Sequence, residues 1–288
     1  MHMLYAIVDT LLPFEWLEMT FMKNGLFALL LISPLLAILG TMAVNQRMAF
    51  FSDALGHSAL TGIALGMMLS LSSDLLSMLL FGVFWALLIT RIKFTETASA
   101  DTVISVFSST SVAMVLMILA RGGGFARFSS LLIGDVLAAT PQALGQAAIA
   151  LVAGLIIWAM LYNALFLSAI NASLAASRGI RVRLISYVFV VLVAVAVMLS
   201  IHLIGVLLIN ALLIIPAAAG RNIAKSARGH TVASAVIALI SAVFGLMLCY
   251  YLDTSAGAGV VICSAGCYFV TLGVRALKMR TGFGGGKT

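Results

Sequence analysis

Residues 24–44 read NGLFALLLISPLLAILGTMAV, a run of 21 residues without a charged side chain. A helix of about 20 apolar residues is long enough to cross the ~30 Å hydrocarbon core of a bilayer. Eight further apolar runs of similar character follow, near 54–72, 75–90, 102–120, 141–163, 184–201, 203–219, 232–251 and 260–277. The pattern predicts an all-α polytopic membrane protein with about eight to nine transmembrane helices.

The composition excludes a soluble globular domain. Of the 288 residues, 63% are hydrophobic and 9% are charged, whereas soluble domains carry about 25% charged residues. We therefore expect residues 23–278 to form one transmembrane domain. Residues 1–22 are expected to form an extracytoplasmic N-terminal segment, and residues 279–288 a flexible cytoplasmic tail.

Three local features modify this pattern. The segment 128–140 (FSSLLIGDVLAAT) is apolar but too short to cross, which predicts a half-helix covered by protein or lining a water-filled cavity. The sixth and seventh runs are separated by very little, around His202 and Gly205. Pro216 is expected to end or bend the seventh span, because proline lacks a backbone donor.

The charged residues indicate the orientation. With the N-terminus outside, 13 of the 16 Lys and Arg residues fall on the cytoplasmic side, in agreement with the positive-inside rule. They are Arg47, Arg91, Lys93, Arg178, Arg181, Arg183, Arg221, Lys225, Arg228, Arg275, Lys278, Arg280 and Lys287. We therefore expect a multi-pass protein of the bilayer with a cytoplasmic C-terminus. Because the net charge of +7 forms no single patch, nucleic acid is not expected as a partner.

Enzyme signatures are missing from the sequence. It contains no HExxH and no GxSxG motif. The tail GFGGGKT would need glycine in place of Thr281 to match a phosphate-binding loop, and no strand is expected before it. We therefore expect no catalytic residue, no permanently bound cofactor and no ATP hydrolysis by this chain itself.

The most informative polar residues are Asp53 and His57, in the segment FSDALGHSALTG that starts at Phe51. A spacing of four places both side chains on one helix face. Asp53 lies six residues beyond Arg47, about 9 Å along a helix, so the pair is at the membrane edge or inside it. Ionisable residues there usually serve function, and carboxylate with imidazole suits Zn²⁺, Mn²⁺ or Fe²⁺. The alternative is that Asp53 caps the helix and His57 bonds to it for structure.

Four motifs resemble one known family. The run RMAFFSDALGHSALTGIALG, residues 47–66, resembles the signature of the permease subunit of bacterial zinc, manganese and iron ABC importers, the ABC-3 metal permeases. In the same order, IGDVLAATP at 133–141, GVLLINALLIIPAA at 205–218 and DTSAG at 253–257 resemble further segments of that family. The resemblance extends over about residues 20–278.

The resemblance implies a type II ABC importer-like fold in the bacterial inner membrane. The permease would pair with a second copy as a homodimer, with a cytoplasmic ABC ATPase subunit and with an extracytoplasmic metal-binding protein. The positions of Asp53 and His57 would lie on the path of the transported ion, which is substrate. Zn²⁺ is favoured over Mn²⁺ or Fe²⁺, because the GDVLAATP stretch and the outer loop look slightly more like zinc permeases.

Other polar residues have less specific interpretations. Asp135 lies near the outer face, where it would line the metal entrance or cap the next element. An entrance role is a minor alternative for Asp253, expected to be a loop or docking residue, and for His202, expected to be structural or interfacial. Asn210 is expected to serve helix packing, because a buried amide needs a partner. His230 is expected to face solvent.

Residues 217–228 form a basic stretch rich in small residues after Pro216. The family resemblance favours a helix that docks into the ATPase and couples it to the membrane domain. The alternative is an anchor for lipid headgroups that uses the same basic side chains. The candidate coupling residues are Ala217, Gly220, Arg221, Lys225 and Arg228.

The chain departs from the family pattern at three places. Many relatives have proline at Thr61, a D-P-x-x-A sequence at Asn171–Ala175 and proline at Ser255. The missing acid at Asn171 is expected to alter an ATPase contact or a loop cap. None of these changes removes a candidate ligand.

Two other classes of function remain open at this stage. One is a secondary transporter, in which Asp53 and His57 relay protons and no ATPase is needed. The other is a membrane scaffold that transports nothing.

Overall fold

The computed structural model describes residues 15–282 except 18, 72, 96–97, 123–133 and 135. All regular elements in these residues are helices, and the two shortest are the 3₁₀ helices η1 (Glu15–Leu17) and η2 (Val136–Ala138). The α-helices are α2 (Thr20–Asn45), α3 (Phe51–Met68), α4 (Asp74–Lys93), α5 (Ala100–Gly122), α7 (Pro141–Ile170), α8 (Ala172–Ser177), α9 (Val182–Ile204), α10 (Val206–Ile223), α11 (Ala227–Leu252) and α12 (Ala256–Gly282).

The prediction of an all-α membrane protein is confirmed. Eight of the described helices, all of the long ones except α3, are long and apolar enough to cross a bilayer. The helix α3 occupies most of the predicted span 54–72 but is not among these eight. Of the predicted half-helix at 128–140, the structure describes only Gly134 and residues 136–140, where η2 forms a single turn.

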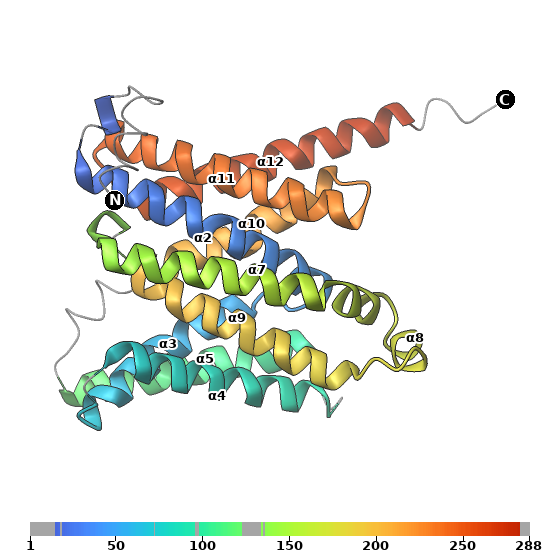
Figure 1. The fold of residues 1–288 in the computed structure, drawn as a ribbon, viewed down its shortest axis with the longest axis horizontal. Helices are drawn as coiled ribbons and strands as arrows, with labels where there is room; N and C mark the ends of the chain where they lie inside the picture. Colours follow the sequence, from blue (N-terminus) through green and yellow to red (C-terminus); the bar gives the residue numbers. More distant parts are fainter. Residues whose placement is uncertain are drawn as a thin grey trace.

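The long helices lie side by side along one direction (Figure 1). The start of α2 and the end of α12 lie at opposite ends of this bundle (Figure 1). We call the end that holds α8 and the end of α12 the basic end, because Arg178, Arg275 and Lys278 belong to it. The basic end and the α11–α12 turn therefore lie at opposite ends of the bundle (Figure 1), as the charge pattern predicts.

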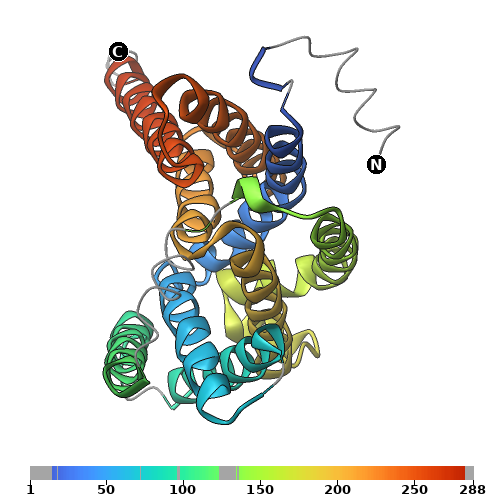
Figure 2. The ribbon, with the colours of Figure 1, turned by 90° about the vertical axis from the view of Figure 1, so that its left-hand side faces the viewer.

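The centre of the bundle is formed by α2 and α10. In α2, 67% of its most apolar 18-residue window is buried, against 11% in α7 and 17% in α12. A Cβ atom at Gly40 of α2 would overlap the backbone oxygen of Leu213 in α10, so the two backbones touch. In the view along the helices, α4 and α5 lie at one edge and α11 and α12 at the other (Figure 2).

A single residue, Gly205, separates α9 from α10, which confirms the two closely spaced spans as separate helices. Its φ of 81° and ψ of 167° lie in a region that essentially only glycine adopts. Gly134, with φ of 70°, packs against the backbone of Ile204 and Gly205. Pro216 was expected to end or bend its helix, and the first alternative is wrong, because α10 continues through it to Ile223. Packing against neighbouring helices allows such a proline inside a membrane helix.

Candidate functional site

A tight connection between α2 and α3 sets the start of the helix that carries Asp53 and His57. Arg47 adopts the left-handed conformation, with φ of 57°. Its amide donates to the oxygen of Val44, and the amide of Met48 donates to the oxygen of Ala43. These bonds form a Schellman-type helix end. Met48, 1% exposed, anchors the turn in the core, and α3 follows three residues later.

Asp53 and His57 lie one turn apart on α3, as the sequence spacing predicts. The His57 Nε2 atom is 3.5 Å from Asp53 Oδ1. The capping alternative for Asp53 is wrong, because Phe50 occupies the N-cap position and Asp53 is the third residue inside the helix. No side chain caps this helix end. The Asp53 carboxylate accepts hydrogen bonds from other helices instead.

Two residues on other helices hold the Asp53 carboxylate. Ser108 Oγ of α5 donates to Asp53 Oδ2 at 3.0 Å, and Asn210 Nδ2 of α10 donates to Asp53 Oδ1 at 3.2 Å. The Asn210 amide finds the partner expected for it, in a contact between α10 and α3, but the sequence predicted neither that this partner is Asp53 nor the role of Ser108. An amide in the middle of an apolar span was the only available signal for Asn210. Four polar side chains from three helices therefore meet at this point.

Further contacts fix α3 against its neighbours around this cluster. Thr61 donates through Oγ1 to the oxygen of Ser111 in α5 at 2.9 Å. A Cβ at Gly56 would overlap the side chain of Val206, the first residue of α10. Since Gly56 lies between Asp53 and His57 in sequence, this close approach keeps the pair beside α10.

The pair remains partly open in the single chain. The side chains of Asp53 and His57 are 45% and 26% exposed, so a ligand can reach both. Bonds of about 2.1 Å from one tetrahedral ion would hold an oxygen and a nitrogen about 3.4 Å apart, and the observed separation is 3.5 Å. Within the described residues, no group of three or more His, Cys, Asp or Glu side chains could hold a metal ion. One chain therefore offers two such ligands here and needs further donors to complete a site.

The other entrance candidates lie apart from this pair or outside the structure. Asp135 falls outside the described residues. Asp253 is exposed and ends α11 in the left-handed conformation, with φ of 50° and ψ of 48°, a conformation that Asp tolerates better than most residues. His202 is exposed in the last turn of α9. The described contacts do not link either residue to Asp53 or His57.

The stretch 217–228 is the end of α10 and the start of α11 rather than a separate helix. Ala217 and Gly220 are buried, and Gly220 packs against Ser234 of α11. Of the five coupling candidates, these two face the protein interior. The exposed ones are Arg221, Lys225 and Arg228.

The environment of His230 differs from the one predicted. It is buried, with 6% of its surface exposed, and its Nε2 atom lies 2.8 Å from the oxygen of Ala217. The expectation of a solvent-facing side chain is wrong, because the imidazole finds a backbone partner between α10 and α11. This contact ties the two helices together at the basic end.

The short helix α8 lies at the basic end between α7 and α9 (Figure 1). Asn171, where the family resemblance would place an acid, caps it by accepting a hydrogen bond from the amide of Leu174 at 3.0 Å. The loop cap therefore survives the loss of the acid. Leu174 itself is 45% exposed, so α8 presents an apolar side chain on the surface of this end.

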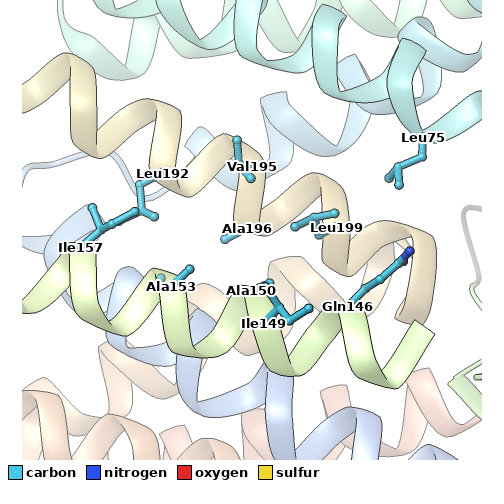
Figure 3. A pocket seen from close by; sticks show the side chains of 11 residues that line it. Leu75, Gln146, Ile149, Ala150, Ala153, Ile157, Leu192, Val195, Ala196 and Leu199 are labelled. Atoms are coloured by element: carbon cyan, nitrogen blue, oxygen red, sulfur yellow. The ribbon is translucent and has the colours of Figure 1, made fainter. Parts of the chain in front are cut away.

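A cavity of about 410 Å³ lies between α7 and α9, away from the polar cluster. Its lining is apolar except for Gln146, and Ile149, Ile157 and Leu192 are among the residues that form it (Figure 3). Because it contains no acidic, histidine or cysteine side chain, it offers no strong ligand to a metal ion.

The sequence matches the ABC 3 transport family over residues 18–275. It is 29% identical to the high-affinity zinc uptake system membrane protein ZnuB of Haemophilus influenzae, over 84% of this chain and 93% of that protein. It is 26% identical to the manganese import system permease protein ScaB of Streptococcus parasanguinis, over 91% and 92%. Its fold is similar to that of PsaBC from Streptococcus pneumoniae, solved in complex with Fab, with a TM-score of 0.76 at 23% identity over 94% of this chain and 95% of that chain.

Proposed function

The chain belongs to the ABC 3 transport family, and we propose that it is the permease subunit of an ATP-driven importer of divalent metal ions. The observation that carries this proposal is the pairing of Asp53 with His57, 3.5 Å apart on α3 and supported by hydrogen bonds from α5 and α10. The matches to a zinc uptake protein and a manganese permease support the same substrate class. Transport would follow alternating access.

Zinc is the proposed ion. The 3.5 Å separation of Oδ1 and Nε2 allows both atoms to reach one ion, and a zinc uptake protein is among the relatives that match this chain. A homodimer would supply up to four ligands, two from each chain. Such ligation must stay weak enough for the ion to leave toward the cytoplasm.

ATP hydrolysis is assigned to a separate cytoplasmic ATPase subunit, and ion delivery to an extracytoplasmic binding protein. We place the ATPase at the basic end, where Arg221, Lys225 and Arg228 are exposed. The capped helix α8, with its exposed Leu174, is a second contact for it. This arrangement puts the C-terminus in the cytoplasm and the α11–α12 turn outside.

The test is zinc uptake into liposomes that contain the chain with its ATPase and its binding protein. We expect Asp53→Asn and His57→Gln each to reduce uptake by at least 10-fold, because each removes one of two ligands from every chain. Asp101→Asn is the matched control, since it removes an exposed carboxylate from the first turn of α5 and should leave uptake unchanged.

The same liposomes separate the proposed function from its alternatives. Uptake that continues without ATP but follows an imposed proton gradient would identify a secondary transporter. If liposomes with all partners present take up no zinc, manganese or iron, a membrane scaffold that transports nothing would be the remaining function. Uptake that needs ATP but is unchanged by both substitutions would support an ATP-driven importer and would rule out Asp53 and His57 as its ion site.

A further inference from the structure

The strongest unassigned feature is a pocket between α7 and α11 at the basic end. Its volume is about 380 Å³, and it is lined by Trp158, Ala159, Tyr162, Arg228, Thr231 and Val232. None of these residues belongs to the polar cluster around Asp53. The pocket therefore needs a separate explanation.

The donors of this pocket suit an anion. Arg228 is exposed and carries a guanidinium whose fork of N–H groups matches a phosphate. It stands in the first turn of α11, which contains no acidic residue. The N-terminus of a 26-residue helix adds a favourable field for negative charge.

Two residues that line the pocket carry a buried donor without an acceptor. Among the described residues, no partner accepts a hydrogen bond from Trp158 Nε1 or Tyr162 Oη, and both atoms are buried. Their rings lie 4.8 Å apart, centroid to centroid, in the wall of the pocket. A buried donor without an acceptor is costly in an apolar environment. An occupant with acceptor oxygens would remove that cost once it opens the wall between the two rings.

The position of the pocket selects a lipid over a soluble anion. The helix α7 has 30 residues, about 45 Å of length, and exceeds the ~30 Å hydrocarbon core. Tyr162 lies eight residues before its end, and Arg228 lies at the start of α11, so the pocket sits near the level of the headgroups. Tryptophan, tyrosine and arginine are the side chains that anchor proteins at this level. Ala159 and Val232 complete the pocket with an apolar surface suited to the top of an acyl chain.

We propose that this pocket binds the headgroup phosphate of an anionic phospholipid, with Arg228 as the ionic anchor and Tyr162 and Trp158 as neutral donors. The proposal needs only that the chain lies in a bilayer, so it does not depend on the transported substrate. It assigns Arg228 to the lipid and leaves Arg221 and Lys225 as the exposed basic residues for the ATPase.

The experiment measures lipid retention by native mass spectrometry on the full chain, titrated with dioleoyl phosphatidylglycerol or dioleoyl phosphatidylcholine. We expect one phosphatidylglycerol to be retained with preference. In Arg228→Gln its half-saturation concentration should rise about 5-fold, the contribution of one arginine near a membrane surface. Tyr162→Phe, which removes only the hydroxyl, should weaken retention a few-fold.

The controls remove the same groups elsewhere. Arg178→Gln takes an exposed arginine from the same end, and Tyr251→Phe takes an exposed hydroxyl from the far end of α11; both should bind like the parent chain. Arg228→Lys should retain most of the binding, and equal melting temperatures in phosphatidylcholine show that the variants are folded. Equal retention of the two lipids, equal loss in Arg178→Gln and Arg228→Gln, or displacement by millimolar inorganic phosphate would overturn the proposal.

Discussion

Asp53 is held by one side-chain donor on each of its two oxygens, Ser108 on Oδ2 and Asn210 on Oδ1. A carboxylate oxygen has two lone pairs, so each oxygen retains one for a cation. The two donors also restrict rotation of the carboxylate, because each oxygen is held by a different helix, α5 or α10. Asp53 is therefore already oriented for the ligand role that we propose for it.

The amide of Asn210 provides a test of this role. We expect Asn210→Ala to raise the KM for zinc uptake about 10-fold while the maximal rate changes little, because a hydrogen bond to a charged group contributes roughly 1.5–3 kcal/mol. Transport kinetics in liposomes give both quantities. Asn163→Ala is the matched control, since Asn163 is exposed on α7. A fall in maximal rate with an unchanged KM would contradict a role in ligand positioning.

Thr61 allows a test of the α3–α5 contact. Thr61→Val keeps the shape and removes the hydrogen bond to the oxygen of Ser111. Polar contacts between membrane helices contribute about 0.6 kcal/mol on average, so we expect the melting temperature to fall by only about 1–2 °C. Differential scanning fluorimetry measures this change. A loss of 10 °C would mean that Thr61 supports more than this one contact.

The sequence predicts part of the site and misses the rest for a physical reason. The spacing of Asp53 and His57 is local, so helix geometry alone places them together. Ser108 and Asn210 lie 55 and 157 residues from Asp53 in sequence, and no periodicity encodes which helices become neighbours. His230 was misplaced for the same reason, because its partner is a backbone oxygen on α10.

Among the elements, the joint between α9 and α10 is the most constrained. Gly205 is the only residue between the two helices, and its backbone conformation is strained for any other residue. We expect Gly205→Ala to cost about 1–3 kcal/mol, measured as a lower melting temperature. Gly145→Ala is the control, because Gly145 lies in α7 with nothing within 4 Å of an added Cβ. That control should leave stability unchanged or raise it.

The helix boundaries show what apolar runs can and cannot predict. The run 141–163 predicted a span, and α7 extends beyond it to Ile170, because helix formation does not stop where the bilayer ends. The helix α10 passes through Pro216, although proline alone favours a break. Tertiary packing decides both outcomes, and a single sequence window contains no information about it.

For the whole molecule, the separation of charge predicts the orientation in the membrane. We expect a membrane-impermeant maleimide to label Asp253→Cys from outside the cell, and Arg178→Cys only after the membrane is opened. The parent chain is the control, since Cys249 is buried and Cys263 and Cys267 lie in the apolar helix α12. Labelling of Arg178→Cys in intact cells would show that the basic end faces outward. The predicted orientation and the proposed ATPase contact at this end would then be wrong.

The helix that carries Asp53 and His57 is the long helix that falls short of the apolar character of a membrane span. The polar residues Asp53 and His57, which we propose as ion ligands, also weaken the partition of α3 into lipid during synthesis. We therefore expect α3 to enter the bilayer together with α2 and α4 rather than alone. Errors in membrane insertion would then affect the proposed ion path before any other part of the protein.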